Sequence, residues 1–204
     1  MSRKQDIPLI CLTIHPPEAG MLDQFVIIAG AILIFGKYMN PDRLKAMHLG
    51  MEGYQRVFAE EQANLFAGPR PDDNIPAGTR VKFLQNWADY DPNDAGTVHV
   101  VFNIEGGHAL YDNENQLANP QKALDNLKAF LDKGFLTLYL TPTHLTPNRF
   151  INHAYGNKLL TKGPLLPRGL GISDYGKDLI DYAYRQGLLI DVKHMSLLAR
   201  RQFT

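Results

Sequence analysis

The chain has 204 residues and carries 21 basic and 21 acidic side chains, so its formal net charge at pH 7 is zero. This balance gives no support for nucleic acid or an anionic membrane surface as a partner. A single cysteine, Cys11, excludes an internal disulfide and cysteine-type zinc sites, so any metal must be held by histidines and carboxylates. Hydrophobic residues make up 45% of the chain, and we expect a single α/β domain over residues 1–204.

No stretch of the sequence predicts export or a membrane span. The apolar run at residues 7–14 contains Pro8 and lacks a small-residue cleavage site. The most apolar segment, residues 25–35, has about half the length that a membrane-spanning helix needs. The sequence therefore leaves the compartment open, with the cytoplasm as the default expectation.

The first third of the chain predicts one strand and two helices. Residues 8–14 form the strand, and a loop with two prolines follows it. Residues 24–39 are apolar and predict a helix. Residues 43–66 carry apolar side chains at helical spacing after an Asn40-Pro41 start signal.

Two polar pairs in this region have metal-competent side chains. His15 and Glu18 follow the first strand, and His48 and Glu52 lie four residues apart on the second helix. We interpret the first pair as an ordinary loop and the second as a solvated helix face. Neither is predicted to form a site.

The next predicted strands are residues 80–87 and 98–104. The second of these is β-branched and apolar almost throughout, which is typical of a strand buried on both faces of a parallel sheet. It ends at Glu105, followed by two glycines and His108. On these residues alone, a functional carboxylate and an ordinary turn with a solvated glutamate are equally compatible with the pattern.

The rest of the chain alternates between helices and strands. Asn119-Pro120 and Ser173-Asp174 are helix start signals, and Ser196 begins a further helix. The predicted elements are a helix at residues 121–133, a strand at 135–140, a helix at 175–186 and a strand at 188–192. Such alternation implies parallel strands joined by crossovers.

Between these elements lies a stretch, residues 145–171, with little periodicity. Loops this long in compact domains are usually functional or disordered. Its hydrogen-bonding side chains have no individual role that the sequence can assign; they include Asn148, Arg149, Asn152, His153 and Tyr155.

Three metal-competent side chains follow predicted strands. Glu105, His144 and His194 each lie just beyond the carboxyl end of an apolar strand. Parallel strands in a (β/α) barrel place these ends at one mouth, where barrel enzymes have their active sites. The pattern therefore predicts one site that contains a carboxylate and two imidazoles.

Three segments resemble the membrane dipeptidase (renal dipeptidase-like) family of zinc metallopeptidases, which are amidohydrolase-type TIM barrels. They are IEGGHAL at residues 104–110, LTPTH at 140–144 and GISDYGKDLIDYAYRQGLLIDVKHMS at 171–196. Their order and spacing agree with the family, and the match covers residues 98–203. The resemblance implies an α/β fold that is part of a (β/α)8 barrel, about strands 2 to 5 or 6.

The resemblance also implies functional roles. Two zinc ions lie at the barrel mouth of the family, bridged by a glutamate that corresponds to Glu105. A zinc-binding histidine corresponds to His194, and a histidine that contacts the substrate and polarises the scissile carbonyl corresponds to His144. The implied reaction is hydrolysis of a dipeptide or small peptide-like substrate by a metal-activated water.

The chain also departs from the family pattern. The family's first strand carries an HxD pair, and no HxD occurs in this sequence. Its later histidine, arginine and aspartate have no counterpart here, so only Glu105 and His194 are retained as zinc ligands. We expect this chain alone to be inactive or very weak.

Other functions stay open at this point. The alternative is a non-catalytic or truncated relative that binds a ligand or partner without hydrolysis, and a third possibility is a purely structural module. The open sheet edges of a partial barrel also predict association, for example as a homo-oligomer.

Overall fold

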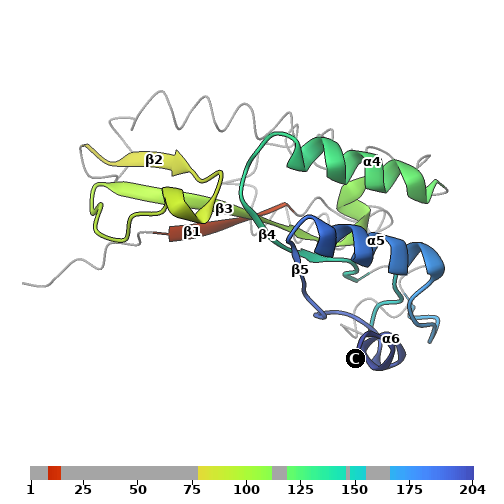
Figure 1. Ribbon diagram of the computed structural model, residues 1–204. Coiled ribbons are helices and arrows are strands. Elements are labelled where there is room, and N and C mark those ends of the chain that lie inside the picture. The colour runs from red at the N-terminus through yellow and green to blue at the C-terminus, as the bar shows by residue number, and fades with distance from the viewer. Residues whose placement is uncertain (1–8, 15–77, 112–118, 146–147, 155–165) are drawn as a thin grey trace, which may run out of the picture.

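The computed structural model describes residues 9–14, 78–111, 119–145, 148–154 and 166–204. The helices predicted at residues 24–39 and 43–66 lie outside these ranges. The same is true of the polar pairs His15/Glu18 and His48/Glu52. Figure 1 shows the described elements in colour.

A parallel sheet organises the described residues (Figure 1). It consists of β1 (Leu9–Ile14), β2 (Arg80–Phe83), β3 (Thr97–Glu105), β4 (Thr137–Thr141) and β5 (Leu189–Ile190). The order is β1-β3-β4-β5, β2 also pairs with β3, and every pairing is parallel. This confirms the predicted α/β class with parallel strands.

The longest strand, β3, lies at the centre of the sheet. β1 runs along one of its edges, from Leu9 opposite His99 to Ile14 opposite Ile104. β2 pairs with the first half of β3, and β4 pairs with the second half. Seven of its nine residues are buried, as the apolar run predicted for a strand covered on both faces.

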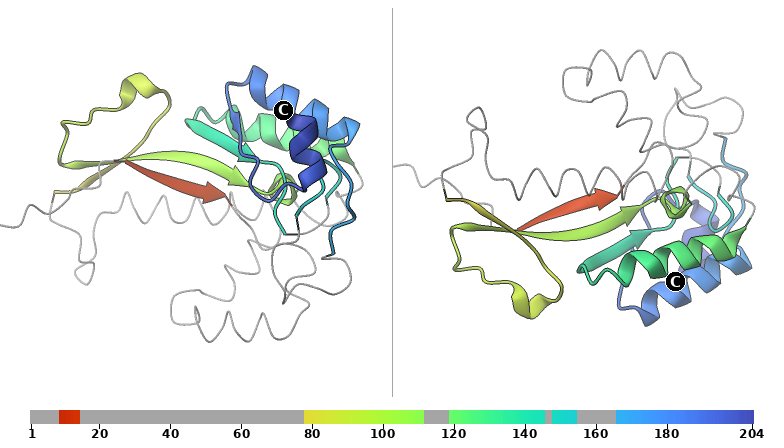
Figure 2. Two further views of the ribbon diagram at one scale, coloured as in Figure 1. Left: turned by 90° about the horizontal axis from the view of Figure 1, so that it is seen from below. Right: turned by 90° about the horizontal axis from the view of Figure 1, so that it is seen from above.

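Two helices, α4 (Pro120–Leu131) and α5 (Asp174–Arg185), lie side by side on one face of the sheet (Figure 2). A shorter helix, α6 (Leu197–Phe203), follows β5. The Ser173 and Ser196 hydroxyls accept hydrogen bonds from backbone amides in the first turns of α5 and α6, so both act as predicted N-caps. Asn119 is the N-cap residue of α4, but its side chain makes no capping bond.

The hydrophobic core lies between β3 and these helices. The Phe102 ring on β3 meets Phe130 of α4 edge-on, with 6.0 Å between centroids, and stacks on Phe83 of β2 at 5.9 Å. Leu127 and Leu179, from α4 and α5, are fully buried in the same cluster. Burying each such side chain contributes about 1.5–3 kcal/mol, so this face fixes the helices on the sheet.

Two strands are shorter than predicted. β2 ends at Phe83 instead of residue 87, because the Asp89 carboxylate accepts a hydrogen bond from the Asn86 amide and closes a 3-10 turn at Trp87–Asp89. β5 has two residues instead of five, because the Asp191 carboxylate accepts the Lys193 amide at 2.9 Å and turns the chain. In both cases a side chain replaces the backbone partner that a longer strand would need.

Within the described residues, β1, β2 and β5 each pair along one edge only. Leu189 on β5 has 67% of its surface exposed. Association through these edges stays a prediction. Among the described helices, none combines the length and the apolar character needed to cross a bilayer.

The turn after β3 depends on two glycines. Gly106 has φ of 93°, a conformation that favours glycine. The α-carbon of Gly107 packs so closely that an added methyl carbon would lie 2.6 Å from the Pro142 carbonyl oxygen and 2.9 Å from the Phe150 ring. Both glycines therefore allow the turn to pack against the loop that follows β4.

We expect Gly107→Ala to lower the free energy of unfolding by about 1–3 kcal/mol, because the Pro142 backbone has to shift to admit the methyl group. Gly96→Ala is the matched control, since its added carbon would meet no atom closer than 3.8 Å. Urea denaturation of both variants measures the difference. Equal stabilities for the two variants would contradict the predicted close packing.

Candidate metal centre

The carboxyl ends of three neighbouring strands meet in register. Glu105, the last residue of β3, pairs with Thr141, the last residue of β4. Asp191 follows β5; its amide donates to the Leu140 carbonyl at 3.0 Å, and its carboxylate accepts the Thr141 hydroxyl at 3.0 Å. The loops after these strands therefore begin at one edge of the sheet, as the sequence predicted.

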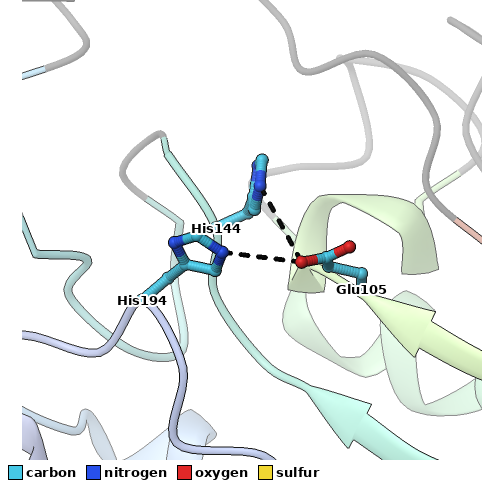
Figure 3. A group of neighbouring side chains, drawn as sticks. All are labelled: Glu105, His144 and His194. Atoms are coloured by element: carbon cyan, nitrogen blue, oxygen red, sulfur yellow. Dashed lines mark ion pairs between the residues drawn. The ribbon is translucent and has the colours of Figure 1, made fainter. Parts of the chain in front are cut away.

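The structure brings Glu105, His144 and His194 together at this edge (Figure 3). Glu105 Oε1 lies 3.5 Å from His194 Nε2 and 3.9 Å from His144 Nε2. The two imidazole rings are 4.4 Å apart between centroids and nearly perpendicular. No second group of three such side chains with metal-compatible spacing occurs in the part of the chain that the structure describes.

The donor atoms of this group fit a metal ion. Zinc bonds of about 2.0–2.2 Å in tetrahedral geometry place neighbouring ligand atoms about 3.4 Å apart. The 3.5 and 3.9 Å separations around Glu105 Oε1 are close to that value. In addition, His194 Nε2 is buried and has no hydrogen-bond partner among the described residues. A buried nitrogen of this kind is available as a metal ligand.

His194 has an unusual backbone conformation. Its φ is 64°, in the left-handed region that residues other than glycine occupy at a cost of about 1–3 kcal/mol. The neighbouring backbone holds it there: the Ala154 amide donates to the His194 carbonyl at 2.6 Å, and the Ser196 amide donates to the Asn152 carbonyl at 2.8 Å. This turn lets the consecutive side chains of Lys193 and His194 both face Glu105.

The backbone carbonyl oxygen of Pro142 accepts hydrogen bonds from both loops that carry site residues, the loop after β3 and the loop after β4. The Pro142 oxygen accepts the Gly107 amide at 3.1 Å and the Asn148 side-chain amide at 2.9 Å. The side-chain oxygen of Asn148, Oδ1, in turn accepts hydrogen bonds from the backbone amides of Phe150 and Ile151. Asn148 therefore positions the loop that carries His144, a role that the sequence alone did not assign.

Lys193 is a neighbour of the site that sequence reasoning missed. Its Nζ donates to Glu105 Oε1 at 3.1 Å, the same oxygen that faces both histidines. The hydrogen bond to Glu105 and its negative charge raise the pKa of Lys193. The sequence offered one indication of this contact: Lys193 directly precedes the proposed ligand His194 in the segment DVKH.

The surroundings of His194 favour its neutral form. Burial lowers the pKa of His194, and electrostatic interactions with His144 and Lys193 add to this effect, while Glu105 opposes it. Metal ligation requires a neutral imidazole. The site therefore keeps His194 in the form that can bind a metal to lower pH than an ordinary histidine would.

A search of protein-family models gives no match, and neither does a search of curated proteins. Solved structures do match. An amidohydrolase from Pseudomonas aeruginosa has a TM-score of 0.50 and 13% identity, with 80% of this chain and 45% of that chain covered. A metallopeptidase from Rhodobacter sphaeroides, liganded with a phosphinate mimic of the dipeptide L-Ala-D-Ala, has a TM-score of 0.51 and 16% identity, with 93% and 47% covered. The described part of the chain therefore shares a parallel α/β fold with part of each of these two structures.

At these identities the structural match establishes the fold alone, and this fold agrees with the part of a (β/α)8 barrel that the three sequence segments predicted. The chain spans less than half the length of either structure. A probable dipeptidase, PvdM from Pseudomonas aeruginosa, matches with a TM-score of 0.42 and 15% identity, with 96% of this chain and 39% of that chain covered.

We expect the stability of the metal-free protein to fall with pH below the ordinary histidine value of 6.5. Because the pKa of folded His194 is lowered, the unfolded chain takes up this proton first, so the free energy of unfolding decreases as pH falls from 6.5 through the folded-state pKa. His194→Gln removes this contribution and flattens the dependence.

Urea denaturation in the presence of a chelator, at several values between about pH 7.5 and pH 5, measures this slope. His108→Gln is the control, since His108 lies outside the three-residue cluster. An unchanged slope in His194→Gln would contradict the prediction.

Proposed function

We propose that this chain provides part of the active site of a zinc-dependent hydrolase that cleaves dipeptides. The observation that carries the proposal is the convergence of one carboxylate and two imidazoles, from three strand ends, at distances that suit a metal ion. The structural match to parts of an amidohydrolase and a metallopeptidase supports it, because enzymes with barrel folds have their chemistry at this end of the strands.

In this proposal, Glu105 and His194 hold the metal. Glu105 has two carboxylate oxygens, so it can contact two zinc ions, and only 19% of its side chain is exposed. His194 offers a buried Nε2 whose ring stays neutral because its pKa is lowered. When bound, zinc would lower the pKa of a water molecule and polarise the peptide carbonyl.

His144 would contact the substrate. Its side chain is 13% exposed and lies beside Glu105 and His194, so a peptide carbonyl that approaches the centre passes within reach of its imidazole. A hydrogen bond from this ring would stabilise negative charge on the carbonyl oxygen during attack. Since His144 Nε2 also lies 3.9 Å from Glu105, metal ligation is the competing role for this residue.

A small peptide-like molecule is the substrate class that we propose. The Rhodobacter sphaeroides metallopeptidase with a similar fold is liganded with a mimic of a dipeptide. Residues 1–204 would act as one α/β unit that supplies Glu105, His144 and His194.

One observation favours the alternative, a relative that binds a ligand without hydrolysis. The sequence has no HxD pair, and Lys193 already neutralises the Glu105 carboxylate. A catalytic zinc site takes three protein ligands, whereas the proposal assigns only Glu105 and His194. Binding of a dipeptide without turnover, in protein shown to contain zinc, would support this alternative.

We expect purified protein to bind zinc, and Glu105→Gln and His194→Asn each to weaken binding by roughly 100-fold or more, since each removes a direct ligand. Elemental analysis after dialysis against defined free zinc measures the stoichiometry. His108→Asn is the control and should retain wild-type zinc content. Equal zinc content in all four proteins would contradict the proposed ligands.

In the complete active site to which this chain would contribute, we expect His144→Asn to retain zinc and to lower kcat/KM for a simple dipeptide by about 10²–10³, because the variant loses a group that stabilises the developing oxyanion. Steady-state hydrolysis assays with zinc-loaded protein measure this effect. Loss of zinc in His144→Asn would instead identify His144 as a metal ligand.

A further inference from the structure

The charges around Glu105 point to a role for its lysine neighbour. A single carboxylate oxygen, Oε1, faces three nitrogen atoms: Lys193 Nζ at 3.1 Å, His194 Nε2 at 3.5 Å and His144 Nε2 at 3.9 Å. The shortest contact is therefore with the ammonium group. The same oxygen also faces His194 Nε2, which belongs to the other ligand of the proposed metal centre.

The ammonium group reaches Glu105 from the solvent side. The Lys193 side chain is 61% exposed, whereas that of Glu105 is 19% exposed. Ion pairs with an exposed partner contribute little to stability, and a lysine stem is flexible, so the contact can open at small cost. Unlike Lys177, which pairs with Asp174 on its own helix, Lys193 contacts a residue 88 positions away in the sequence.

The backbone fixes the position of Lys193 next to the site. The Asp191 carboxylate accepts the Lys193 amide at 2.9 Å, and the left-handed His194 follows directly. Asp191 is in turn held by the Thr141 hydroxyl at the end of β4. The lysine stem therefore starts from an anchored turn, whereas its side chain is largely exposed to solvent.

We propose that Lys193 competes with a divalent cation for the Glu105 carboxylate. Its ammonium group contacts Glu105 in the metal-free site and moves away when the cation binds. This competition sets the affinity of the site for the cation. This inference rests on the proposed metal centre and adds the residue that controls its occupancy. It requires only a fixed positive charge on Lys193.

The effect has two physical sources. Glu105 Oε1 has to break its contact with Lys193 before it can bind a cation, and the displaced ammonium group then stays near a like charge. Removing one unit charge about 5 Å from a divalent ion changes its affinity by roughly tenfold in a water-like dielectric. Because the lysine is exposed, added salt should reduce this difference.

The test is the zinc affinity of the full 204-residue chain, measured by competition with a chromophoric chelator at fixed pH and ionic strength. Lys193→Met keeps most of the stem and removes the charge, whereas Lys193→Arg keeps the charge. Lys177→Met is the matched control, because it removes an equally exposed lysine from an ion pair on α5. Glu105→Gln reports whether binding occurs at this centre.

We expect Lys193→Met to bind zinc at least about tenfold more tightly than wild type, with Lys193→Arg and Lys177→Met close to wild type. Binding by Lys193→Met alone, with none by wild type, would support the proposal equally. Equal affinity of wild type and Lys193→Met, with binding lost in Glu105→Gln, would overturn the role of Lys193 and leave the metal centre intact.

Two further outcomes would also overturn the proposal. Tight binding by Lys193→Arg, equal to that of Lys193→Met, would show that charge is not the cause. No binding by any variant, including Lys193→Met, would refute the metal centre itself, and the role of Lys193 with it. Circular dichroism of each variant confirms that the fold is retained.

Discussion

The pairing between the ends of β3 and β4 is the interaction on which the candidate site depends. Glu105 lies opposite Thr141, and the amides of Gly106 and Gly107 continue the ladder to the carbonyls of Thr141 and Pro142 at 2.7 and 3.1 Å. Because these bonds extend past the strand ends, the two loops leave the sheet together. Glu105 and the loop that carries His144 are therefore positioned by backbone hydrogen bonds.

The sequence predicts the long elements well and the short ones poorly, for a physical reason. β3, α4 and α5 follow from burial patterns repeated over nine or twelve residues, with start signals at Asn119 and Ser173. β2 and β5 have few residues, so a single carboxylate that accepts a backbone amide is enough to end them. Hydrophobic patterns carry no information about that competition between side chain and strand partner.

The same distinction applies to the site. Parallel strands place their carboxyl ends together, so the convergence of Glu105, His144 and His194 could be expected from the order of elements. The contact of Lys193 with Glu105 could not, because it depends on the left-handed turn at His194. The hydrogen bond from the Asn148 side chain to the Pro142 carbonyl could not be expected either. It depends on the path of a loop whose sequence has no periodic pattern.

The fold and the chemistry of this centre rest on different atoms. Backbone amides and carbonyls, together with Asn148 and Asp191, hold the loops in place. Lys193 and the two imidazoles, in contrast, meet at one oxygen of Glu105 through side chains alone. Substitutions among these side chains can therefore alter charge and metal affinity with little effect on the scaffold. In the proposed metal centre, the backbone would thus keep the geometry of the ligands, while Lys193 alone would change how readily a cation fills it.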